Sequence, residues 1–492
     1  MPMREWPVLY VRFRTGEHFY IYDTYSNQIL ETPQRVWQRV DSVFQQVSAG
    51  KTAPPRAADD EDGLREARAS VDEAIGNGYF QPCAIDRMHF YPSEDMMRER
   101  VSNLMPQLTL ELTEQCNSRC RYCAYASDTR RTRRPRHMSL RTARNALSMY
   151  LGHSGRSATR CISFWGGEPL VRFETMRRVF EWVRAECPDN PPFFQFTTNA
   201  GLITPEVARV LVENNVKLLV SLDGPKQIHD RHRLSASGEG TFDRTLQGLT
   251  RLHEQDSAYY ARNVRFNCVM SPGTPLADVF DFFSTHPLVR GHQVEYSPVT
   301  ATGTPFVDEY YGLDHDQQTY VYRAFVDAAR RGTPVINDNV ARIMFKALKR
   351  VALRSRKSFN GVVPPNGCCV PLLKKMHVMV KGDIYLCEQL PHLNSLGNVN
   401  KGALDVERAV KMVREYVAHS VSECSMCWAL RLCAACYQHF MKNCSWDASR
   451  RQSECEGQRA HLLRGLCQYA TIVERYPMAF NDWRNVKFEA PV

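Results

Sequence analysis

The sequence has no long apolar run and no strong excess of one charge. No stretch approaches the roughly 18 uncharged apolar residues of a membrane-spanning helix, so we expect no membrane span. Residues 1–6 lack the apolar stretch of a secretion signal, which leads us to expect a cytoplasmic protein. The net charge of +10, from 63 basic and 53 acidic residues, is too small to indicate nucleic-acid binding. With 43% apolar and 24% charged residues, the composition is that of a folded protein.

Cysteine, in contrast, is abundant, and its count of 17 is odd. In a reducing compartment such cysteines favour metal or cluster ligation over disulfide bonds. Cys116, Cys120 and Cys123 form one tight group, and nine more cysteines lie from Cys368 to Cys455. The remaining ones are scattered, and we expect them to be small buried apolar residues: Cys83, Cys161, Cys187, Cys268 and Cys467.

The length of 492 residues allows about three domains. Three short strands and two helices before residue 84 predict an α+β domain that is winged-helix-like. From residue 366 the helical pattern gives way to a cysteine-rich region. The expected divisions are 1–84, a linker at 85–105, a core at 106–330, a bridging region at 331–365, a cysteine-rich domain at 366–467 and a tail at 468–492.

The core alternates apolar strand candidates with amphipathic helices. The six expected strands are residues 108–112, 161–164, 193–196, 216–221, 264–269 and 293–296. This alternation predicts the α/β class, with parallel units forming a partial (β/α)6 TIM-like barrel. In such folds the chemistry lies where the strands end. Glu295 and Tyr296 lie near the end of the last expected strand, and we expect their side chains to face the substrate. Cys268 lies near the end of the strand before it, but we expect it to pack in the core.

The first cysteine group has the spacing C-x3-C-x2-C and directly follows the first core strand. Three thiolates on one short loop can each hold one iron of a [4Fe–4S] cluster, which leaves the fourth iron open to a small chelating molecule. The alternative is a structural zinc site. Such sites use four ligands, and no fourth ligand lies nearby in the sequence.

This loop resembles that of the radical S-adenosylmethionine (SAM) enzymes, and later motifs extend the resemblance. Gly166-Gly167-Glu168 follows the second strand and resembles the family's GGE motif. Thr197-Thr198-Asn199 ends the third strand, and Ser221-Leu222-Asp223-Gly224-Pro225 ends the fourth. The segments 229–233 and 238–242 then follow, as in many members of the family. A single Gly-Gly-Glu sequence is weak evidence for this family. Several of its motifs in the same order, each at a strand end, are strong evidence together.

The resemblance implies a set of SAM-binding residues. Gly166, Gly167 and Glu168 would hold the amino group, since a carboxylate accepts strong, charge-assisted hydrogen bonds from an ammonium group. Ser221 and Arg233 would hold the carboxylate or the ribose. Tyr122 would lie near the adenine, and Asn199 and Asp223 complete the set. For two of these residues a role without SAM binding remains open: Tyr122 as a packing residue and Arg233 as a surface charge.

The resemblance also implies the chemistry. An electron from the reduced cluster would cleave SAM to a 5′-deoxyadenosyl radical, which would abstract hydrogen from the substrate. The cofactor supplies this reaction, while the protein positions the reactants and excludes water. A reducing partner such as flavodoxin or ferredoxin would supply the electron.

The C-terminal cysteines resemble the SPASM extension, which carries two auxiliary [4Fe–4S] clusters, for three in total. By resemblance Cys369, Cys387 and Cys436 would hold the first, and Cys424, Cys427, Cys433 and Cys455 the second. Two residues, Ala434 and Ala435, precede the last cysteine of the central run where relatives have three. Cys368 remains open as a fourth ligand of the first cluster, and Cys444 as a rival to Cys455. A zinc-ribbon arrangement is the alternative for the region.

The first 84 residues resemble the precursor-recognition element of enzymes that mature ribosomal peptides. Such an element would bind a leader peptide by adding a strand to an exposed sheet edge, here residues 27–31. The alternative is a plain structural cap. The arginine-rich run at 130–136 is read as a solvated loop, or as a segment that steers an acidic peptide.

Taken together, the resemblances predict a radical SAM/SPASM peptide maturase. Its reaction would form a thioether or carbon–carbon crosslink in a ribosomally made precursor peptide. The alternatives are an anaerobic sulfatase maturase that forms formylglycine, a radical SAM dehydrogenase and a non-catalytic metal-binding scaffold.

Overall fold

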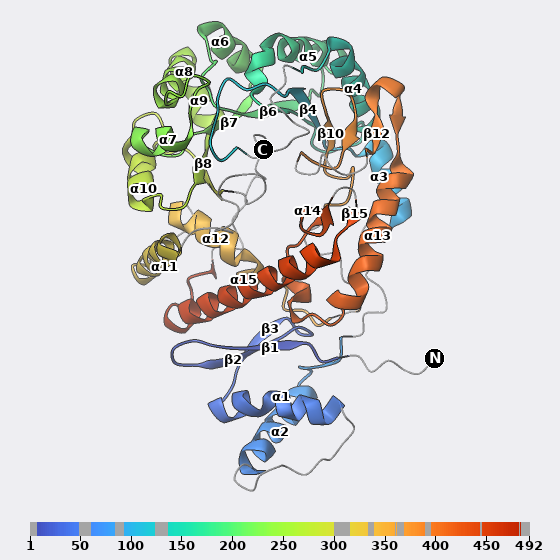
Figure 1. Cartoon of the computed structure of the whole chain (residues 1–492), viewed down its shortest axis with the longest axis vertical. Helices are drawn as coiled ribbons and strands as arrows, with labels where there is room; N and C mark the ends of the chain where they lie inside the picture. Colours follow the sequence, from blue (N-terminus) through green and yellow to red (C-terminus); the bar gives the residue numbers. More distant parts are fainter. Residues whose placement is uncertain are drawn as a thin grey trace.

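The N-terminal part is a three-stranded antiparallel sheet with two helices. The computed structural model describes residues 7–48, 61–83, 93–123, 136–299, 315–332, 339–359, 361, 369–388, 395–442, 445–481 and 483. The strands are β1 (Tyr10–Arg14), β2 (Phe19–Asp23) and β3 (Gln28–Glu31), in the order β1-β2-β3. Helices α1 (Gln34–Ser48) and α2 (Glu61–Gly76) lie on one side of this sheet (Figure 1). The strands and helices expected in this segment are therefore present.

The core is an eight-stranded sheet in the order β11-β10-β4-β5-β6-β7-β8-β9. Its central strands are β4 (Gln107–Thr113), β5 (Cys161–Gly166), β6 (Phe193–Thr198), β7 (Lys217–Ser221), β8 (Val264–Met270) and β9 (Val294–Pro298). Each of these pairs in parallel with the next, as the sequence predicts. The outer face is covered by α4 (Leu140–His153), α5 (Phe173–Glu186), α6 (Pro205–Glu213), α8 (Phe242–Gln255) and α10 (Leu276–Thr285) (Figure 1).

Two short strands from the cysteine-rich region extend this sheet, which the sequence pattern does not predict. Strand β10 (Met376–Val378) pairs in parallel with β4, and β11 (Ile384–Tyr385) pairs antiparallel with β10. Met376 and Val378 lie opposite Leu108 and Leu110, and all four are fully buried. The C-terminal region is thus part of the same hydrophobic core as the barrel.

The C-terminal region also contains two long helices where few periodic stretches are expected. They are α13 (Val406–Cys424) and α15 (Ala448–Arg475), and α15 runs through the expected boundary at residue 467. The linker expected at 85–105 contains α3 (Glu94–Asn103), which begins at the N-cap Ser93 and contacts α13. The bridging helices are α11 (His315–Arg330) and α12 (Asn339–Ala352), and α12 packs on α15.

The remaining elements are short. They are α7 (Lys226–His232), α9 (Ser257–Asn263), α14 (Tyr437–Phe440), the 3-10 helices η2 (Pro169–Arg172), η3 (Val399–Lys401) and η4 (Trp428–Arg431), and strands β12 (Gly397–Asn398), β13 (Ala403–Leu404), β14 (Met441–Lys442) and β15 (Ser445–Trp446). Within the described ranges, no helix has the length and apolar character needed to cross a bilayer.

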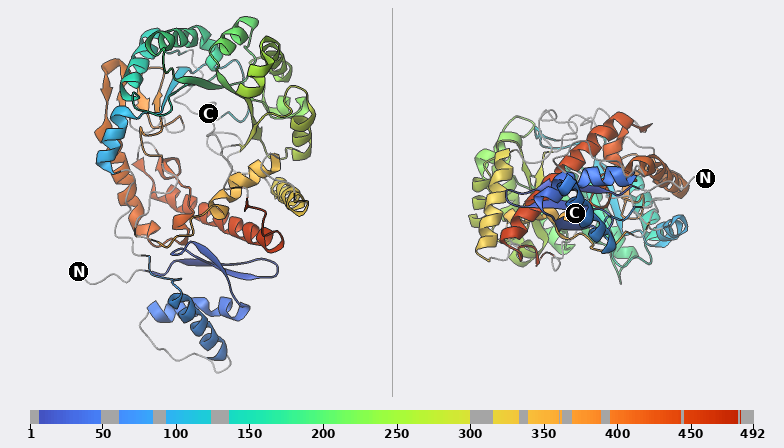
Figure 2. Two further views of the ribbon diagram at one scale, coloured as in Figure 1. Left: turned by 180° about the vertical axis from the view of Figure 1, so that it is seen from behind. Right: turned by 90° about the horizontal axis from the view of Figure 1, so that it is seen from below.

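The N-terminal sheet lies against α15, on the side away from the barrel (Figures 1 and 2). Its β2–β3 turn is held by hydrogen bonds from two distant segments. Arg431 donates to the Tyr25 carbonyl at 2.7 Å, and Arg354 donates to the Asn27 carbonyl at 2.9 Å. Tyr20 donates to Glu474 of α15 at 2.8 Å. The sheet is therefore anchored to the rest of the chain by its turn, and this turn directly precedes strand β3.

Candidate active site

The motif residues gather at one edge of the parallel sheet. The cysteine loop (residues 116–123) follows β4, Gly166 ends β5, Asn199 follows β6 and Asp223 follows β7. The carboxyl ends of parallel strands meet at a common edge, which is why residues so far apart in sequence come together. Asn199 donates to Asn117 in the cysteine loop at 2.7 Å. Backbone bonds from Arg119 to the Leu234 carbonyl (2.6 Å) and from Arg121 to the His232 carbonyl (2.9 Å) hold the loop in place.

The two glycines of the second motif lie directly against the cysteine loop. Gly166 has φ +139°, which disfavours any other residue, and a Cβ there would overlap the Thr113 carbonyl. A Cβ on Gly167 would lie 2.9 Å from the Cys116 nitrogen. The backbone of Glu168 donates to the Gln115 carbonyl at 3.0 Å. The glycines therefore allow the end of β5 to approach the loop that carries the cysteines.

Glu168 is a buried carboxylate at the centre of this edge, with 2% of its surface exposed. It accepts hydrogen bonds from the Asn199 amide (2.8 Å), the Thr198 hydroxyl (2.9 Å) and the Leu170 amide (3.2 Å). Burial raises the pKa of Glu168 to about 7, although these three hydrogen bonds oppose the rise. An ionised carboxylate in this position is a strong partner for a cationic group.

The cysteine thiols share this anionic surrounding. The pKa of Cys116 is raised to about 12 by burial, by Glu168 and by the neighbouring Cys120 and Cys123. Several thiolates beside a carboxylate are stable only when a metal centre compensates their charge. Among the described residues, no three His, Cys, Asp or Glu side chains converge on one metal ion. A [4Fe–4S] cluster, in contrast, spreads its thiolates over separate irons, so the donor set of this loop fits such a cluster.

Tyr122, Asp223 and Arg233 form a buried network beside the cysteine loop. Arg233 donates to Asp223 at 2.9 Å, the Tyr122 hydroxyl donates to the same carboxylate oxygen, and the guanidinium lies 5.3 Å from the centre of the Tyr122 ring. The Val269 amide binds the other oxygen of Asp223 at 2.9 Å. Arg233 is 6% exposed and is thus not a surface charge. Ser221 is also buried and ends β7. Asp223 therefore sets the orientation of both Tyr122 and Arg233.

Four C-terminal cysteines line one cavity. Cys424 ends α13, Cys427 is the N-cap of η4, Cys433 follows η4 and Cys455 lies on α15. The pKa of Cys424 is raised to about 12, chiefly by burial and also by the other three cysteines, while Arg451 opposes the rise. Among the described residues no three of these thiols converge on one metal ion, so this set of four thiols fits a [4Fe–4S] cluster, whose ligands bind separate irons.

The buried Arg451 next to these thiols is absent from the expected site residues. It is 2% exposed, donates to Cys424 Sγ at 3.6 Å and lies 5.4 Å from the Phe440 ring centre. A spacing of four residues on one helix places it beside Cys455, and this spacing is the sequence signal that identifies it. Thr198, which holds Glu168, is likewise absent from the expected set although it belongs to the third motif.

The cysteines expected to hold the first auxiliary cluster lie on separate elements. Cys369 lies two residues before a turn, Cys387 follows β11 and Cys436 is the N-cap of α14. Cys368, Cys444 and the run from Arg130 to Pro135 lie outside the described residues. Arg136, the last arginine of that run, forms an ion pair with Glu114 at 2.8 Å.

The core also matches a known family. Residues 110–284 match the family model of the Radical SAM superfamily, and the parallel sheet of this segment is of the kind typical of that superfamily's partial barrel. It is 28% identical over 189 residues to the radical SAM cyclopropyl synthase TigE of Paramaledivibacter caminithermalis, covering 36% of this chain and 37% of that protein. It is 29% identical over 151 residues to the cysteine-type anaerobic sulfatase-maturating enzyme of Clostridium novyi, covering 30% of this chain and 40% of that protein.

A solved structure resembles most of the chain. The structure of native anSMEcpe with bound AdoMet and Kp18Cys peptide has a TM-score of 0.55 at 21% identity, and covers 78% of this chain and 100% of that chain. At this identity the likeness concerns the fold. The chain spans between 37% and 48% of the length of the first curated relatives that it matches.

Proposed function

We propose that this radical SAM enzyme is a peptide maturase that forms a thioether or carbon–carbon crosslink in a ribosomally made precursor peptide. One arrangement supports the proposal above all: a small sheet that ends in the edge strand β3 is joined through its turn to a cysteine-rich region and a radical SAM core. The solved structure of anSMEcpe, which contains a bound peptide, agrees with such a substrate class.

In this proposal Cys116, Cys120 and Cys123 hold the SAM-binding cluster. When bound, SAM and its cluster supply the reductive cleavage that leads to hydrogen abstraction. Glu168 receives the amino group of SAM, and Asp223 orients Tyr122 and Arg233 toward the rest of the molecule. The burial of these groups excludes water, which strengthens each electrostatic contact in the site.

The direct test uses the short open reading frame next to the gene, when one is present. Anaerobically reconstituted enzyme, SAM and reductant are incubated with the peptide that the frame encodes, and the product is analysed by mass spectrometry. A crosslink removes two hydrogens and leaves the peptide backbone intact. An unmodified peptide, together with formylglycine in a sulfatase-derived peptide, would contradict the proposal.

Sulfatase maturation is the second candidate function. It is favoured by the sulfatase-maturating relatives from Clostridium novyi and Bacteroides thetaiotaomicron, the latter 27% identical over 194 residues. The N-terminal sheet distinguishes the two, because that activity has no need of a domain for binding a leader peptide.

We further propose that strand β3 is the edge to which the leader peptide adds. The Thr32 amide donates to the Phe19 carbonyl at 2.9 Å, which fixes the alternation of the β2–β3 ladder. In an antiparallel pair, alternate residues direct their backbone groups away from the partner strand. Ile29 and Glu31 therefore direct their amides and carbonyls outward, where an extended peptide can pair with them.

Replacing Glu31 by proline is expected to weaken leader binding by about tenfold or more, because proline removes an outward amide and blocks the incoming strand. The matched control is Glu31→Ala, which keeps the amide and loses only the ion pair with His18 at 2.7 Å. Affinity is measured on the full chain with the labelled N-terminal segment of the precursor peptide. Equal affinities for the proline and alanine variants would exclude β3 as the binding edge.

For the C-terminal clusters we propose that Cys369, Cys387 and Cys436 hold the first and Cys424, Cys427, Cys433 and Cys455 the second. These clusters would accept the electron released when the product forms, or bind the substrate directly. Arg451 would then stabilise the reduced, more negative form of the second cluster, since it is a buried cation with a hydrogen bond to a ligand sulfur.

Replacing Arg451 by methionine is accordingly expected to lower the reduction potential of the second auxiliary cluster by about 60 mV, the one-electron equivalent of about 1.4 kcal/mol. Arg451→Lys keeps the positive charge and is the matched control. Potentials are measured by redox titration followed by electron paramagnetic resonance, with the iron content checked in each variant. An unchanged potential at full iron content would contradict a tuning role.

A further inference from the structure

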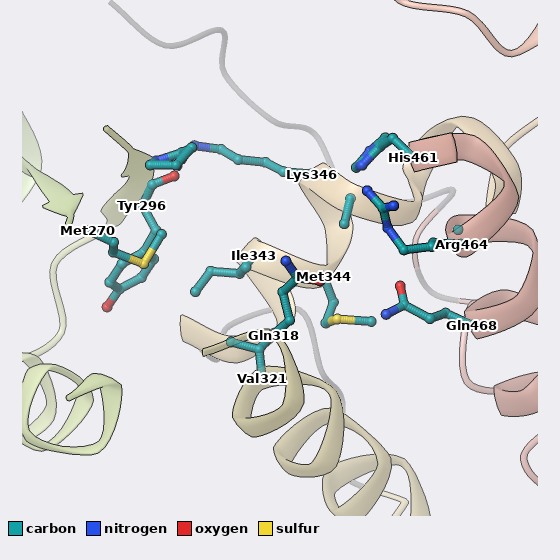
Figure 3. Close-up of a pocket in the computed structure, with 13 residues that line it drawn as sticks. Met270, Tyr296, Gln318, Val321, Ile343, Met344, Lys346, His461, Arg464 and Gln468 are labelled. Atoms are coloured by element: carbon teal, nitrogen blue, oxygen red, sulfur yellow. Dashed lines mark hydrogen bonds between the residues drawn. The ribbon is translucent and has the colours of Figure 1, made fainter. Parts of the chain in front are cut away.

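A cavity of about 260 Å³ lies where the bridging helices meet the barrel and α15. Met270 and Pro298, at the ends of β8 and β9, form one wall with Tyr296. Figure 3 shows α12 and α11 along its middle, with side chains of α15 projecting toward them from the opposite wall. The remaining lining residues are Gln318, Val321, Ile343, Met344, Lys346, Ala347, His461, Arg464, Gly465 and Gln468.

The wall from α15 is polar, and the rest is mostly apolar. His461, Arg464 and Gln468 are spaced by three and four residues, so they share one face of the helix, and all three project into the cavity (Figure 3). Methionine, isoleucine, valine and proline side chains form the apolar surface opposite them. The cavity therefore combines polar groups at one end with an apolar wall, as small-ligand sites do.

The charge of this cavity is not balanced by its own lining. Lys346 forms an ion pair with Glu295 at 2.8 Å and donates to the Tyr296 carbonyl at 2.9 Å. Among the described residues, neither Arg464 nor His461 has an ion pair, and none of the lining residues is acidic. Burial and the adjacent Arg464 lower the pKa of His461, so its ring is a neutral hydrogen-bonding group near pH 7. Arg464 thus faces the cavity as a cation with no anionic partner in the part of the chain that the structure describes.

The cavity is also close to the candidate active site along the chain. Met270 follows Val269, whose amide holds Asp223 at 2.9 Å in the network with Tyr122 and Arg233. The cavity volume of about 260 Å³ is slightly below the roughly 300–1,000 Å³ of typical ligand pockets. A cavity of this size suits one or two side chains of a substrate rather than a whole cofactor.

We propose that this cavity binds a carboxylate of the peptide substrate, with Arg464 pairing to the carboxylate and the apolar wall covering its aliphatic stem. A guanidinium matches the two oxygens of a carboxylate with two parallel hydrogen bonds. His461 and Gln468 donate further hydrogen bonds. The inference rests on the proposed peptide substrate. It adds that the enzyme prefers peptides with an acidic residue, or the C-terminal end of the chain, close to the modified position.

The test measures the binding of fluorescein-labelled Gly-Leu-Glu-Leu-Gly amide to the full, reconstituted enzyme by fluorescence anisotropy at low salt. A second probe carries Gln in place of Glu, and a third is this Gln peptide with a free C-terminal carboxylate. Arg464→Gln is expected to weaken binding of the acidic probe by tenfold or more, and Arg464→Lys to restore part of it. The control is Arg475→Gln, on the same helix, whose side chain is 62% exposed.

Preferred binding of the Glu probe assigns the site to an acidic side chain, and preferred binding of the free-acid probe assigns it to the chain end. Equal binding of all three probes, or binding that Arg464→Gln leaves unchanged, overturns the inference. The measurement needs no reductant and no turnover. A protein that binds the acidic probe through Arg464 but modifies no precursor would contradict the proposed maturase and leave the carboxylate site standing.

Discussion

Replacing Cys120 by alanine is expected to reduce SAM cleavage to the rate seen without enzyme. Cys120 is one of the three thiols on the cysteine loop, which is held by backbone bonds to residues 232 and 234. Without it, two thiolates remain for the cluster, and the geometry that leaves one iron open to SAM is lost. The measurement is the yield of 5′-deoxyadenosine from anaerobically reconstituted and reduced protein.

The matched control for this variant is Cys187→Ala. Cys187 is also a partly buried cysteine, but it caps the end of α5, away from the strand ends that form the site. The Cys187→Ala protein should cleave SAM at the parent rate. A Cys120→Ala protein that still forms 5′-deoxyadenosine at that rate would show that the cluster is held elsewhere.

Replacing Glu168 by glutamine is expected to weaken SAM binding by at least about thirtyfold. The change removes the negative charge that we propose pairs with the amino group of SAM, and losing one partner of a buried charge pair costs about 2 kcal/mol or more. The glutamine oxygen can still accept hydrogen bonds from Thr198 and the Asn199 amide, so the fold around it is retained. Affinity is measured by equilibrium dialysis of labelled SAM under anaerobic conditions.

The pH dependence of the same affinity gives a second signature of Glu168. Because its pKa is raised to about 7, the carboxyl group is neutral below that pH and ionised above it. Only the ionised form attracts the ammonium, so SAM affinity of the parent enzyme should rise as pH increases through about 7. Glu168→Gln should lose this rise, whereas Glu174→Gln, on the exposed surface of α5, should keep it. A rise that persists in Glu168→Gln would assign it to another group.

The sequence predicts the central sheet well because its strands are apolar runs separated by amphipathic helices. It does not predict β10 and β11, since strands of three and two residues have too short a pattern to be recognised. Their pairing depends on burial against Leu108 and Leu110, which is a tertiary effect. Helices α13 and α15 are also not expected, because the prediction for that region depends on its cysteine motifs, although α13 has apolar residues such as Val410 and Val413 at helical spacing.

The candidate site divides in the same way. Residue spacing within one loop predicts the three cysteines as ligands, and the motif order predicts Glu168 as a SAM-binding residue. Spacing does not predict that Tyr122 and Arg233 meet on Asp223, because Tyr122 and Asp223 lie 101 residues apart and meet only through the parallel order of the strands. The positions of the Arg451 and Arg464 side chains depend on which face of α15 contacts its neighbours. That face is set by packing against α12 and α14, which the sequence pattern does not predict.

Coordination of SAM by an iron of the cysteine loop is measured most directly by electron–nuclear double resonance. The reduced enzyme is mixed with SAM carrying ¹⁵N in its amino group, and the coupling of that nitrogen to the cluster spin is recorded. We expect a direct coupling in the parent protein and none in Cys120→Ala. Parent protein that lacks this coupling although it is reduced and saturated with SAM, or that contains zinc as its only metal, would contradict the assignment of Cys116, Cys120 and Cys123.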